Sequence, residues 1–262
     1  MMFLNTVTTA AQTLSPEEIE KAEQIRQYLV NNWYGALGTL VDKGSLQEGA
    51  YYLIVALFAV VAYLMGSMNF AVIISKLKFG EDIRTKGSGN AGATNMSRTY
   101  GKAAGIVTLL GDIMKTVVPV LLAKILVGDV YGYLTGLFCA LGHAFPCYYK
   151  FKGGKCVAVT AAIALVMEPL VFLFLLIIFA ATVGLTKYVS LGSVLAAMTF
   201  PVLLHNIMKI KYGVGNFGII FVIINCLLVI YLHRSNLKRL LEGKENKFQF
   251  KKVKKDDKKE EK

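Results

Sequence analysis

The chain has 262 residues, of which 55% are hydrophobic and 18% charged, and its 29 Lys and Arg against 17 Asp and Glu give a net charge of +12. A mean hydropathy of +0.53 beside a pI near 9.4 indicates that apolar and basic residues are segregated along the chain. These values exclude disorder for most of the chain and favour an integral membrane protein, and the four cysteines lack the paired spacing of a metal site or disulfide framework.

Residues 1–50 are predicted to form a separate, extracytoplasmic N-terminal extension. Ser15-Pro16-Glu17-Glu18 has the pattern of a helix N-cap followed by proline in the first turn, and apolar residues recur on one face of the stretch that follows. We expect a water-soluble cap. An interfacial amphipathic helix anchored by Trp33 and Tyr34 is the alternative.

From residue 51 to 246 the sequence predicts a membrane-integral domain, an all-α polytopic bundle of about seven transmembrane helices. The candidate spans are 51–77, 103–127, 130–146, 156–168, 170–186, 188–204 and 217–232. Several are near or below the usual minimum of about 17 residues, so five spans with re-entrant segments are the main alternative. Pro169 is expected to separate the fourth span from the fifth.

The distribution of Lys and Arg predicts the orientation of the bundle. Five basic residues lie in the first loop, three in the third and Lys187 in the fifth, whereas the loops after the second and fourth spans carry only Asp129 and Glu168. Because cytoplasmic loops collect positive charge, we expect the N-terminus outside the cell membrane and the C-terminus inside. Lys209 and Lys211 violate the pattern, since they fall in a loop expected outside.

The C-terminal tail, from His233 onward, contains 12 basic and 6 acidic residues, a net charge of +6. Its first part predicts an amphipathic helix at the membrane surface, and residues 247–262 predict a Lys-rich, disordered cytoplasmic end. No recognition motif accompanies this charge, so we expect a lipid bilayer and no nucleic acid as partner.

The first loop gathers three glycines and several small polar residues. Its sequence is Lys86-Gly87-Ser88-Gly89-Asn90-Ala91-Gly92-Ala93-Thr94-Asn95-Met96-Ser97-Arg98. Glycines let successive backbone N–H groups point into one concavity, which Arg98 would close as an anion site. No nucleotide-phosphate fingerprint is present, and a flexible turn is the alternative.

The third loop contains Gly142-His143-Ala144-Phe145-Pro146 and then Phe151-Lys152-Gly153-Gly154-Lys155. Lys155 stands where a membrane helix is expected to begin, so the partial positive charge of the helix N-terminus adds to that of the lysine and favours an anionic ligand. Simple anchoring by cytoplasmic lysines is the alternative. For His143 we expect a packing or backbone-bonding histidine.

Further polar residues lie at the predicted cytoplasmic ends of the last two spans. His233 and Asn236 share one helix face, and Ser190 and Ser193 lie just inside the sixth span. All these clusters fall on one membrane face, which predicts a cationic, glycine-lined pocket for a phosphate-bearing substrate and an acyl chain.

Within the second span, Asp112 and Lys115 are three residues apart. We expect a buried structural ion pair there, rather than a proton relay. From another functional class, an anion transporter or channel is the alternative to an enzyme, although transporter sites are usually placed near the bilayer midplane between repeats.

Three motifs resemble those of the bacterial acyl-phosphate-dependent glycerol-3-phosphate acyltransferases. They are Gly87-Ser88-Gly89-Asn90 to Gly92-Ala93-Thr94-Asn95 with Arg98, Gly142-His143-x-Phe145-Pro146 to Phe151-Lys152-Gly153-Gly154-Lys155, and His233-Arg234-x-Asn236 through Leu240-Leu241-x-Gly243-x-Glu245. The resemblance extends from about residue 55 to 247. Where the family usually has glycine after the lysine, this chain has Cys156, and Met68-Asn69-Phe70-Ala71 stands where the family usually has Ile-Pro-Phe-Gly.

The resemblance implies a membrane enzyme that transfers a fatty acyl group from acyl phosphate to the 1-hydroxyl of sn-glycerol 3-phosphate, giving lysophosphatidic acid and phosphate, the first step of phospholipid synthesis. It implies no metal or cofactor and a functional unit that is a monomer. The catalytic residues implied are Ser88, Arg98, Lys155 and His233. The substrate-binding residues implied are Ser88, Asn90, Arg98, Gly153, Gly154, Lys155, Ser190, His233 and Asn236, with the amides of the two glycines reaching a phosphate.

Overall fold

The computed structural model describes residues 15–17, 19–20, 35–213 and 217–247. Within these residues it consists of helices and turns and has no strand, so the all-α prediction is confirmed. The α-helices are α3 (Gly35–Asp42), α4 (Glu48–Ser67), α5 (Phe70–Phe79), α6 (Ala93–Tyr100), α7 (Lys102–Val127), α8 (Asp129–Ala144), α9 (Val157–Met167), α10 (Pro169–Thr186), α11 (Val189–Tyr212), α12 (Ile219–Leu232) and α13 (Arg234–Leu241). Two 3₁₀ turns are η2 (Ile83–Thr85) and η3 (Cys147–Tyr149).

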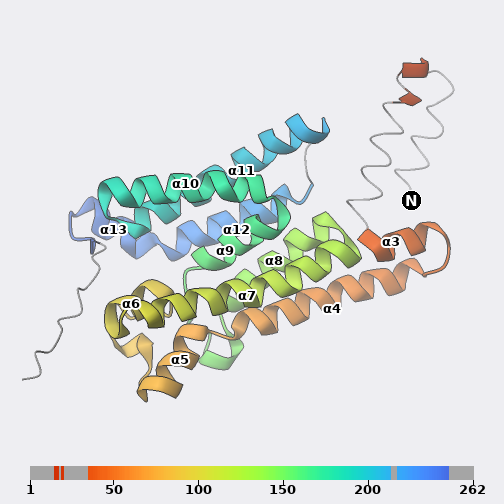
Figure 1. Ribbon diagram of the computed structural model, residues 1–262. Helices are drawn as coiled ribbons and strands as arrows, with labels where there is room; N and C mark the ends of the chain where they lie inside the picture. The colour runs from red at the N-terminus through yellow and green to blue at the C-terminus, as the bar shows by residue number, and fades with distance from the viewer. Residues whose placement is uncertain (1–14, 18, 21–34, 214–216, 248–262) are drawn as a thin grey trace, which may run out of the picture.

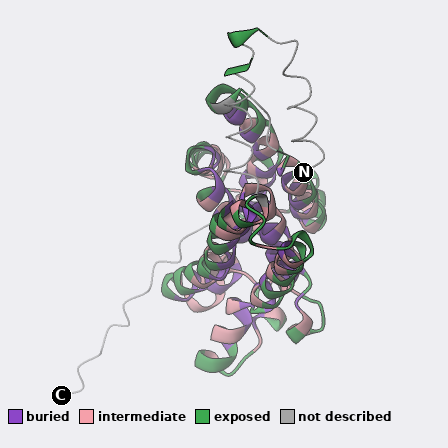
Figure 2. Cartoon of the chain, turned by 90° about the vertical axis from the view of Figure 1, so that its right-hand side faces the viewer, coloured by how far each residue is buried: buried purple, intermediate pink, exposed green. Residues whose placement is uncertain are grey.

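The long helices form an elongated bundle (Figure 1). Helices α4, α7 and α8 pack together on one side and α10, α11 and α12 on the other, with α9 in contact with both groups. Buried residues face the centre of the bundle and exposed residues cover its outside (Figure 2). The short helices α5, α6 and α13 lie at one end, and α3 lies at the opposite end.

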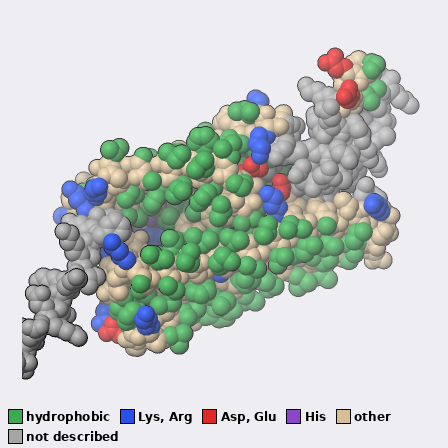
Figure 3. All heavy atoms as spheres, in the orientation of Figure 1, with side chains coloured by type: hydrophobic (Ala, Val, Ile, Leu, Met, Phe, Trp, Pro, Cys, Tyr) green, Lys and Arg blue, Asp and Glu red, His purple; other side chains and the backbone are tan. Residues whose placement is uncertain are grey.

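The flank of the bundle is covered by hydrophobic side chains, while the visible Lys and Arg lie toward its ends (Figure 3). By length and composition, four helical segments of the described chain could cross a membrane: α4 with α5, α7, α10 and α11. The pair α12 and α13, bent by 53°, would be a fifth. Helix α8, with 16 residues, and α9, with 11, are too short, so the predicted count of seven is not confirmed.

The first predicted span is broken into two helices at Met68 and Asn69. In a continuous helix the N–H of Val72 would bond to the carbonyl of Met68. Here it donates instead to Oδ1 of Asn69 at 3.1 Å, so Asn69 is the N-cap of α5. The carbonyl of Met68 is thereby left for another donor.

The sixth predicted span extends further than expected. Helix α11 continues to Tyr212, which places Lys209 and Lys211 in its last turn and not in a loop. The Nζ atom of Lys211 lies 3.1 Å from a carboxylate oxygen of Glu168. One of the two basic residues that violated the charge pattern is therefore paired with an acidic residue at the same end of the bundle.

Pro169 separates two helices, as predicted. Helix α9 ends at Met167 and α10 begins at Pro169. The Nζ atom of Lys124 donates to the carbonyls of Val166 and Met167 at 3.1 and 3.0 Å, so it satisfies two carbonyls that the end of α9 leaves without a helical partner.

The described part of the N-terminal segment meets the bundle through α3. Leu37 and Val41 pack against the buried cluster around Tyr51 and Val55. Near Ser15, the N–H of Ile19 donates to the Ser15 carbonyl at 2.9 Å, as a helix beginning there requires. Residues 21–34, with Trp33 and Tyr34, and residues 248–262 lie outside the described chain, so the domain boundaries stay predictions.

Candidate active site

Lys155 lies between η3 and α9, where its ammonium group meets the short helix α13. Its Nζ donates a hydrogen bond to Oδ1 of Asn236, and Nδ2 of Asn236 donates to Oε1 of Glu245 at 2.7 Å. Asn236 is buried and Lys155 is half-buried. The second and third sequence motifs are thus joined through one side-chain amide.

Glu245 is the centre of this group. The hydroxyl of Ser190 donates to Oε1 at 2.9 Å, and Nε of Arg239 donates to Oε2 at 2.7 Å. The Glu245 side chain is only 6% exposed. Burial raises its pKa, but the hydrogen bonds from Asn236, Arg239 and Ser190 together outweigh burial and hold the pKa below its usual value. Glu245 is therefore a carboxylate at neutral pH.

Two arginines add positive charge around Lys155. Arg98, on α6, donates to the carbonyl of Asn246 at 3.4 Å, and Arg239 lies on α13. Burial, the largest cause, and the charges of Arg239 and Arg98 together lower the pKa of Lys155 to about 8, while the charge of Glu245 opposes them. Three cations and one carboxylate leave this group with a net charge of +2, which suits a phosphate dianion.

His233 occupies the bend between α12 and α13, and it is 3% exposed. Its Nδ1 lies 2.8 Å from the carbonyl oxygen of Val229. A carbonyl can only accept, so Nδ1 carries the proton and Nε2 of the neutral ring is a hydrogen-bond acceptor. Lys155 and Glu245 are both close enough to act electrostatically on this ring.

Asn95, which belongs to the first motif but was not predicted as a site residue, organises the glycine-rich first loop from within. Its Oδ1 accepts from the N–H of Ser88 at 3.0 Å, and its Nδ2 donates to the carbonyls of Lys86 and Asn90, each at 3.0 Å. The Ser88 amide is thus used inside the loop and not for an open anion nest. Ser88 itself is exposed and Asn90 half-buried.

The two glycines before Lys155 allow close contact with the chain itself. The N–H of Gly153 donates to the Ala144 carbonyl at 3.1 Å, and the N–H of Gly154 donates to the His143 carbonyl at 3.0 Å. A Cβ at Gly154 would also lie 2.7 Å from the carbonyl oxygen of Ala91, which brings the first motif against the second. The prediction that these two amides reach a phosphate conflicts with their bonds to the end of α8.

Arg84 and Asn69, neither singled out by the sequence as site residues, hold these loops in place. NH1 of Arg84 donates to the carbonyls of Tyr149 and Lys152 at 2.9 and 3.2 Å, while its other nitrogens bond Asp82. Nδ2 of Asn69 donates to the Ala91 carbonyl at 3.3 Å. Arg84 therefore ties the first loop to two carbonyls of the third, and Asn69 ties the first loop to the break between α4 and α5.

Cys156, which replaces the family's usual glycine, has a φ of +63° and is buried. This left-handed conformation favours glycine, which explains the family pattern. Its Sγ donates to the Ala140 carbonyl at 3.2 Å. The side chain points into the packing between α8 and α9.

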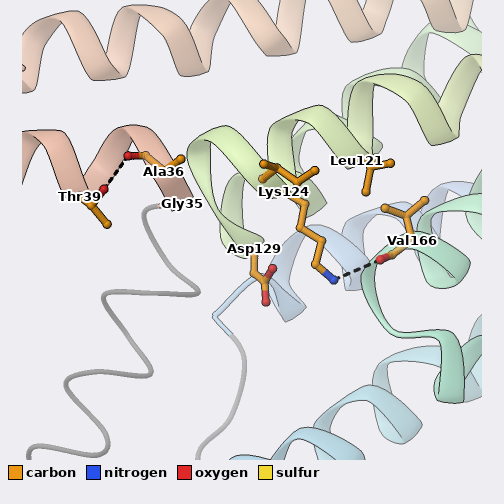
Figure 4. A pocket seen from close by; sticks show the side chains of 8 residues that line it. Gly35, Ala36, Thr39, Leu121, Lys124, Asp129 and Val166 are labelled. Atoms are coloured by element: carbon orange, nitrogen blue, oxygen red, sulfur yellow. Dashed lines mark hydrogen bonds between the residues drawn. The ribbon is translucent and has the colours of Figure 1, made fainter.

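A cavity of about 420 Å³ lies at the opposite end of the molecule (Figure 4). It is bordered by α3 residues such as Gly35 and Thr39, by Lys124 and Asp129, and by Val166. None of the motif residues lines it. In the described chain, no three His, Cys, Asp or Glu side chains are grouped so that they could hold a metal ion.

The buried ion pair predicted in α7 is confirmed. Nζ of Lys115 lies 2.8 Å from Oδ1 of Asp112, and each side chain is 2% exposed.

A family model described as glycerol-3-phosphate acyltransferase matches residues 56–243. A glycerol-3-phosphate acyltransferase of Clostridioides difficile (strain 630) is 42% identical over 202 residues, which is 75% of this chain and 96% of the relative. That of Bacillus subtilis (strain 168) is 38% identical over 198 residues, 76% of this chain and 100% of the relative.

Two solved structures have the same fold. A crystal structure of PlsY (YgiH), an integral membrane glycerol 3-phosphate acyltransferase, in its glycerol 3-phosphate form has a TM-score of 0.69 and 35% identity, and it covers 74% of this chain and 96% of that one. The lysophosphatidic acid form has a TM-score of 0.66 and 33% identity, with 75% and 96% covered. The chain described above belongs to the glycerol-3-phosphate acyltransferase family of integral membrane enzymes.

Proposed function

We propose that this enzyme transfers a fatty acyl group from acyl phosphate to the 1-hydroxyl of sn-glycerol 3-phosphate, giving lysophosphatidic acid and phosphate. The names of its relatives and the ligands of the PlsY structures support the acceptor and the product. The observation that carries the proposal is the group formed by Lys155, Asn236 and Glu245, with Arg98 and Arg239 beside it. Its net charge of +2 matches the two negative charges of a phosphate monoester near pH 7.

The reaction needs little beyond positioning and charge neutralisation. The 1-hydroxyl oxygen attacks the acyl carbon, an ester bond forms, and the bond from that carbon to the phosphate oxygen breaks with its electron pair leaving on phosphate. Phosphate is a good leaving group, so the site requires no strong general acid and mainly has to hold two anions together. The hydroxyl proton passes to Nε2 of His233 or to a phosphate oxygen of the substrates.

We assign the cationic residues to the phosphate groups, since charge-assisted hydrogen bonds are the strong ones. Lys155 and Arg98 bind phosphate directly, and His233 lies beside Lys155 as the proton acceptor. The remaining substrate contacts are assigned to Ser88, Asn90, Ser190 and Asn236.

The enzyme is placed in the cell membrane with the site facing the cytoplasm, the N-terminus outside and the C-terminus inside. The charge asymmetry of the loops supports this orientation. The site residues lie at the end of the bundle formed by α5, α6 and α13, where a donor with its acyl chain in the bilayer can present its phosphate. The functional unit is a monomer.

The test is a donor comparison with the purified protein. Acyl phosphate, acyl-CoA and acyl carrier protein are each supplied with glycerol 3-phosphate, and the lysophosphatidic acid and phosphate formed are measured. We expect product with acyl phosphate alone, at one phosphate released per product molecule. Turnover with a thioester donor and none with acyl phosphate would overturn the assigned donor.

A further inference from the structure

A second charged group lies inside the bundle and is separate from the Lys155 group. It consists of Asp112 and Lys115 on α7 and His143 near the end of α8, with exposed fractions of 2%, 4% and 3%. Three groups surround the Lys115 ammonium: Oδ1 of Asp112 at 2.8 Å, the Met68 carbonyl at 2.8 Å and Nδ1 of His143 at 2.9 Å. The contact with Asp112 is an ion pair, and the contacts with Met68 and His143 are hydrogen bonds.

The contact with Lys115 determines the state of the histidine ring. An ammonium can only donate, so Nδ1 of His143 accepts and the neutral ring carries its proton on Nε2. The Nε2 side of the ring lies against Gly154, where a Cβ would collide with it. The His143 carbonyl also accepts the N–H of Gly154 at 3.0 Å. His143 therefore holds Gly154 through its ring and its backbone.

Stability alone is a weak reason to keep such a group. Removing charges from water costs several kcal/mol per ion, and a buried ion pair often stabilises a protein no more than apolar side chains of the same size. The position of the charged group is a better explanation, because its histidine contacts Gly154, the residue that precedes Lys155.

We infer that Lys115, through His143, is a positioning residue that fixes the Gly153–Gly154 segment and thereby directs the Lys155 ammonium toward the substrate phosphate. The inference rests on the proposed function for the identity of that substrate. Lys115 fixes the ring, the ring and carbonyl of His143 fix Gly154, and Gly154 fixes the backbone of Lys155. The group acts on acceptor binding and does not touch the reacting atoms.

Two variants test this chain of contacts. His143→Gln removes the ring while keeping a polar side chain. The double variant Asp112→Asn with Lys115→Met removes both charges together, so neither is left buried without its partner. For each we measure kcat and KM for both substrates, the melting temperature, and hydrogen exchange of the amides in residues 146–156.

We expect KM for glycerol 3-phosphate to rise about tenfold in both variants, with KM for acyl phosphate within about twofold of wild type. Amides in residues 146–156 should exchange faster. Combining the substitutions should raise KM no further than either alone, because all three residues act through one contact.

Tyr51→Phe is the matched control. It removes a buried hydrogen bond of 2.8 Å between α4 and the Val127 carbonyl, at the far end of α7. It should lower the melting temperature and leave KM and exchange in residues 146–156 unchanged.

A folded His143→Gln enzyme with wild-type KM and wild-type exchange in residues 146–156 would overturn the inference. If the double variant does not fold, the result for His143→Gln is sufficient to test the inference. If the wild-type enzyme releases no phosphate with glycerol 3-phosphate, the proposed function fails. The exchange measurement still decides whether His143 positions the segment.

Discussion

The Lys155 ammonium donates its hydrogen bond to the amide oxygen of Asn236 and not to a carboxylate. A neutral partner fixes the lysine without cancelling its charge, so the charge remains available to an anionic ligand. The carboxylate of Glu245 is held one side chain away, where Asn236, Arg239 and Ser190 satisfy it. Asn236 thus lies between the Lys155 ammonium, which is expected to bind phosphate, and the Glu245 carboxylate, which holds Asn236, Arg239 and Ser190 in place.

Asn236→Asp should reduce kcat/KM for glycerol 3-phosphate more than tenfold. The new carboxylate would neutralise Lys155 and face Glu245 without a donor between them. Steady-state kinetics and a thermal melt measure the two effects. Ser235→Ala, at an exposed position of the same helix, should match wild type. An active Asn236→Asp enzyme with normal KM would exclude the role given to this amide.

Removing either cation expected to bind phosphate should abolish activity in a folded protein. Lys155→Ala and Arg98→Ala each lose charge-assisted hydrogen bonds worth about 1.5 to 3 kcal/mol, and positioning losses add to this, so we expect a decrease of at least about 100-fold. Activity and melting temperature are measured together. Lys152→Ala, an exposed lysine of the same loop, is the control and should remain active. Normal turnover of either site variant would refute the assignment.

The pH dependence should report Lys155. Its pKa is lowered to about 8, chiefly by burial, and the ammonium is the form that binds phosphate. Activity is therefore present below about pH 8 and lost above it, and kcat/KM should fall about tenfold per pH unit on the alkaline side. Lys155→Arg, less active but charged throughout, should lack this decline. A wild-type profile that stays flat to pH 9.5 would contradict the prediction.

Cys156 should be a position where glycine is better tolerated than alanine. Both substitutions remove the Sγ contact with Ala140, but only glycine relieves the left-handed backbone at φ +63°. We expect Cys156→Gly to be more stable than Cys156→Ala by about 1 kcal/mol. Thermal melts in one detergent compare the two. The reverse order would show that the backbone there is not strained.

No covalent acyl-enzyme should accumulate. The acceptor hydroxyl attacks the donor directly in the proposed reaction. In the described chain Cys139, Cys156 and Cys226 are buried thiols, and the half-buried Cys147 lies in the 3₁₀ turn η3. Intact-protein mass spectrometry after incubation with acyl phosphate alone should find the unmodified mass. An added acyl group that glycerol 3-phosphate then removes would establish a two-step route instead.

Hydrophobic runs and motif residues were sufficient to predict a helical membrane bundle, the division at Pro169 and the Asp112–Lys115 pair. The helix ends were predicted less well. The Asn69 cap of α5 is a local contact with Val72, but it lies inside a long apolar run that predicts one continuous span. The continuation of α11 to Tyr212 brings Lys211 to Glu168, a partner 43 residues away that the local sequence does not indicate.

The candidate site, like the fold, was predicted from the sequence only in part. Lys155 and Asn236 lie in motifs and were predicted as site residues, and the structure brings them into contact. Asn95 and Arg84 were missed as site residues because their importance lies in which backbone carbonyls they reach. Such contacts exist only once the loops have folded, and residue type alone does not indicate them.

The break between α4 and α5 couples residues 68–72 to Lys115, which is far from them in the sequence. The side chain of Asn69 accepts the N–H of Val72, which leaves the Met68 carbonyl without its helical donor, and Lys115, 47 residues later, donates to that carbonyl instead. Relatives should therefore change these positions in concert. A lineage that restores a continuous first helix would leave a buried ammonium short of an acceptor, and it should also have replaced the lysine.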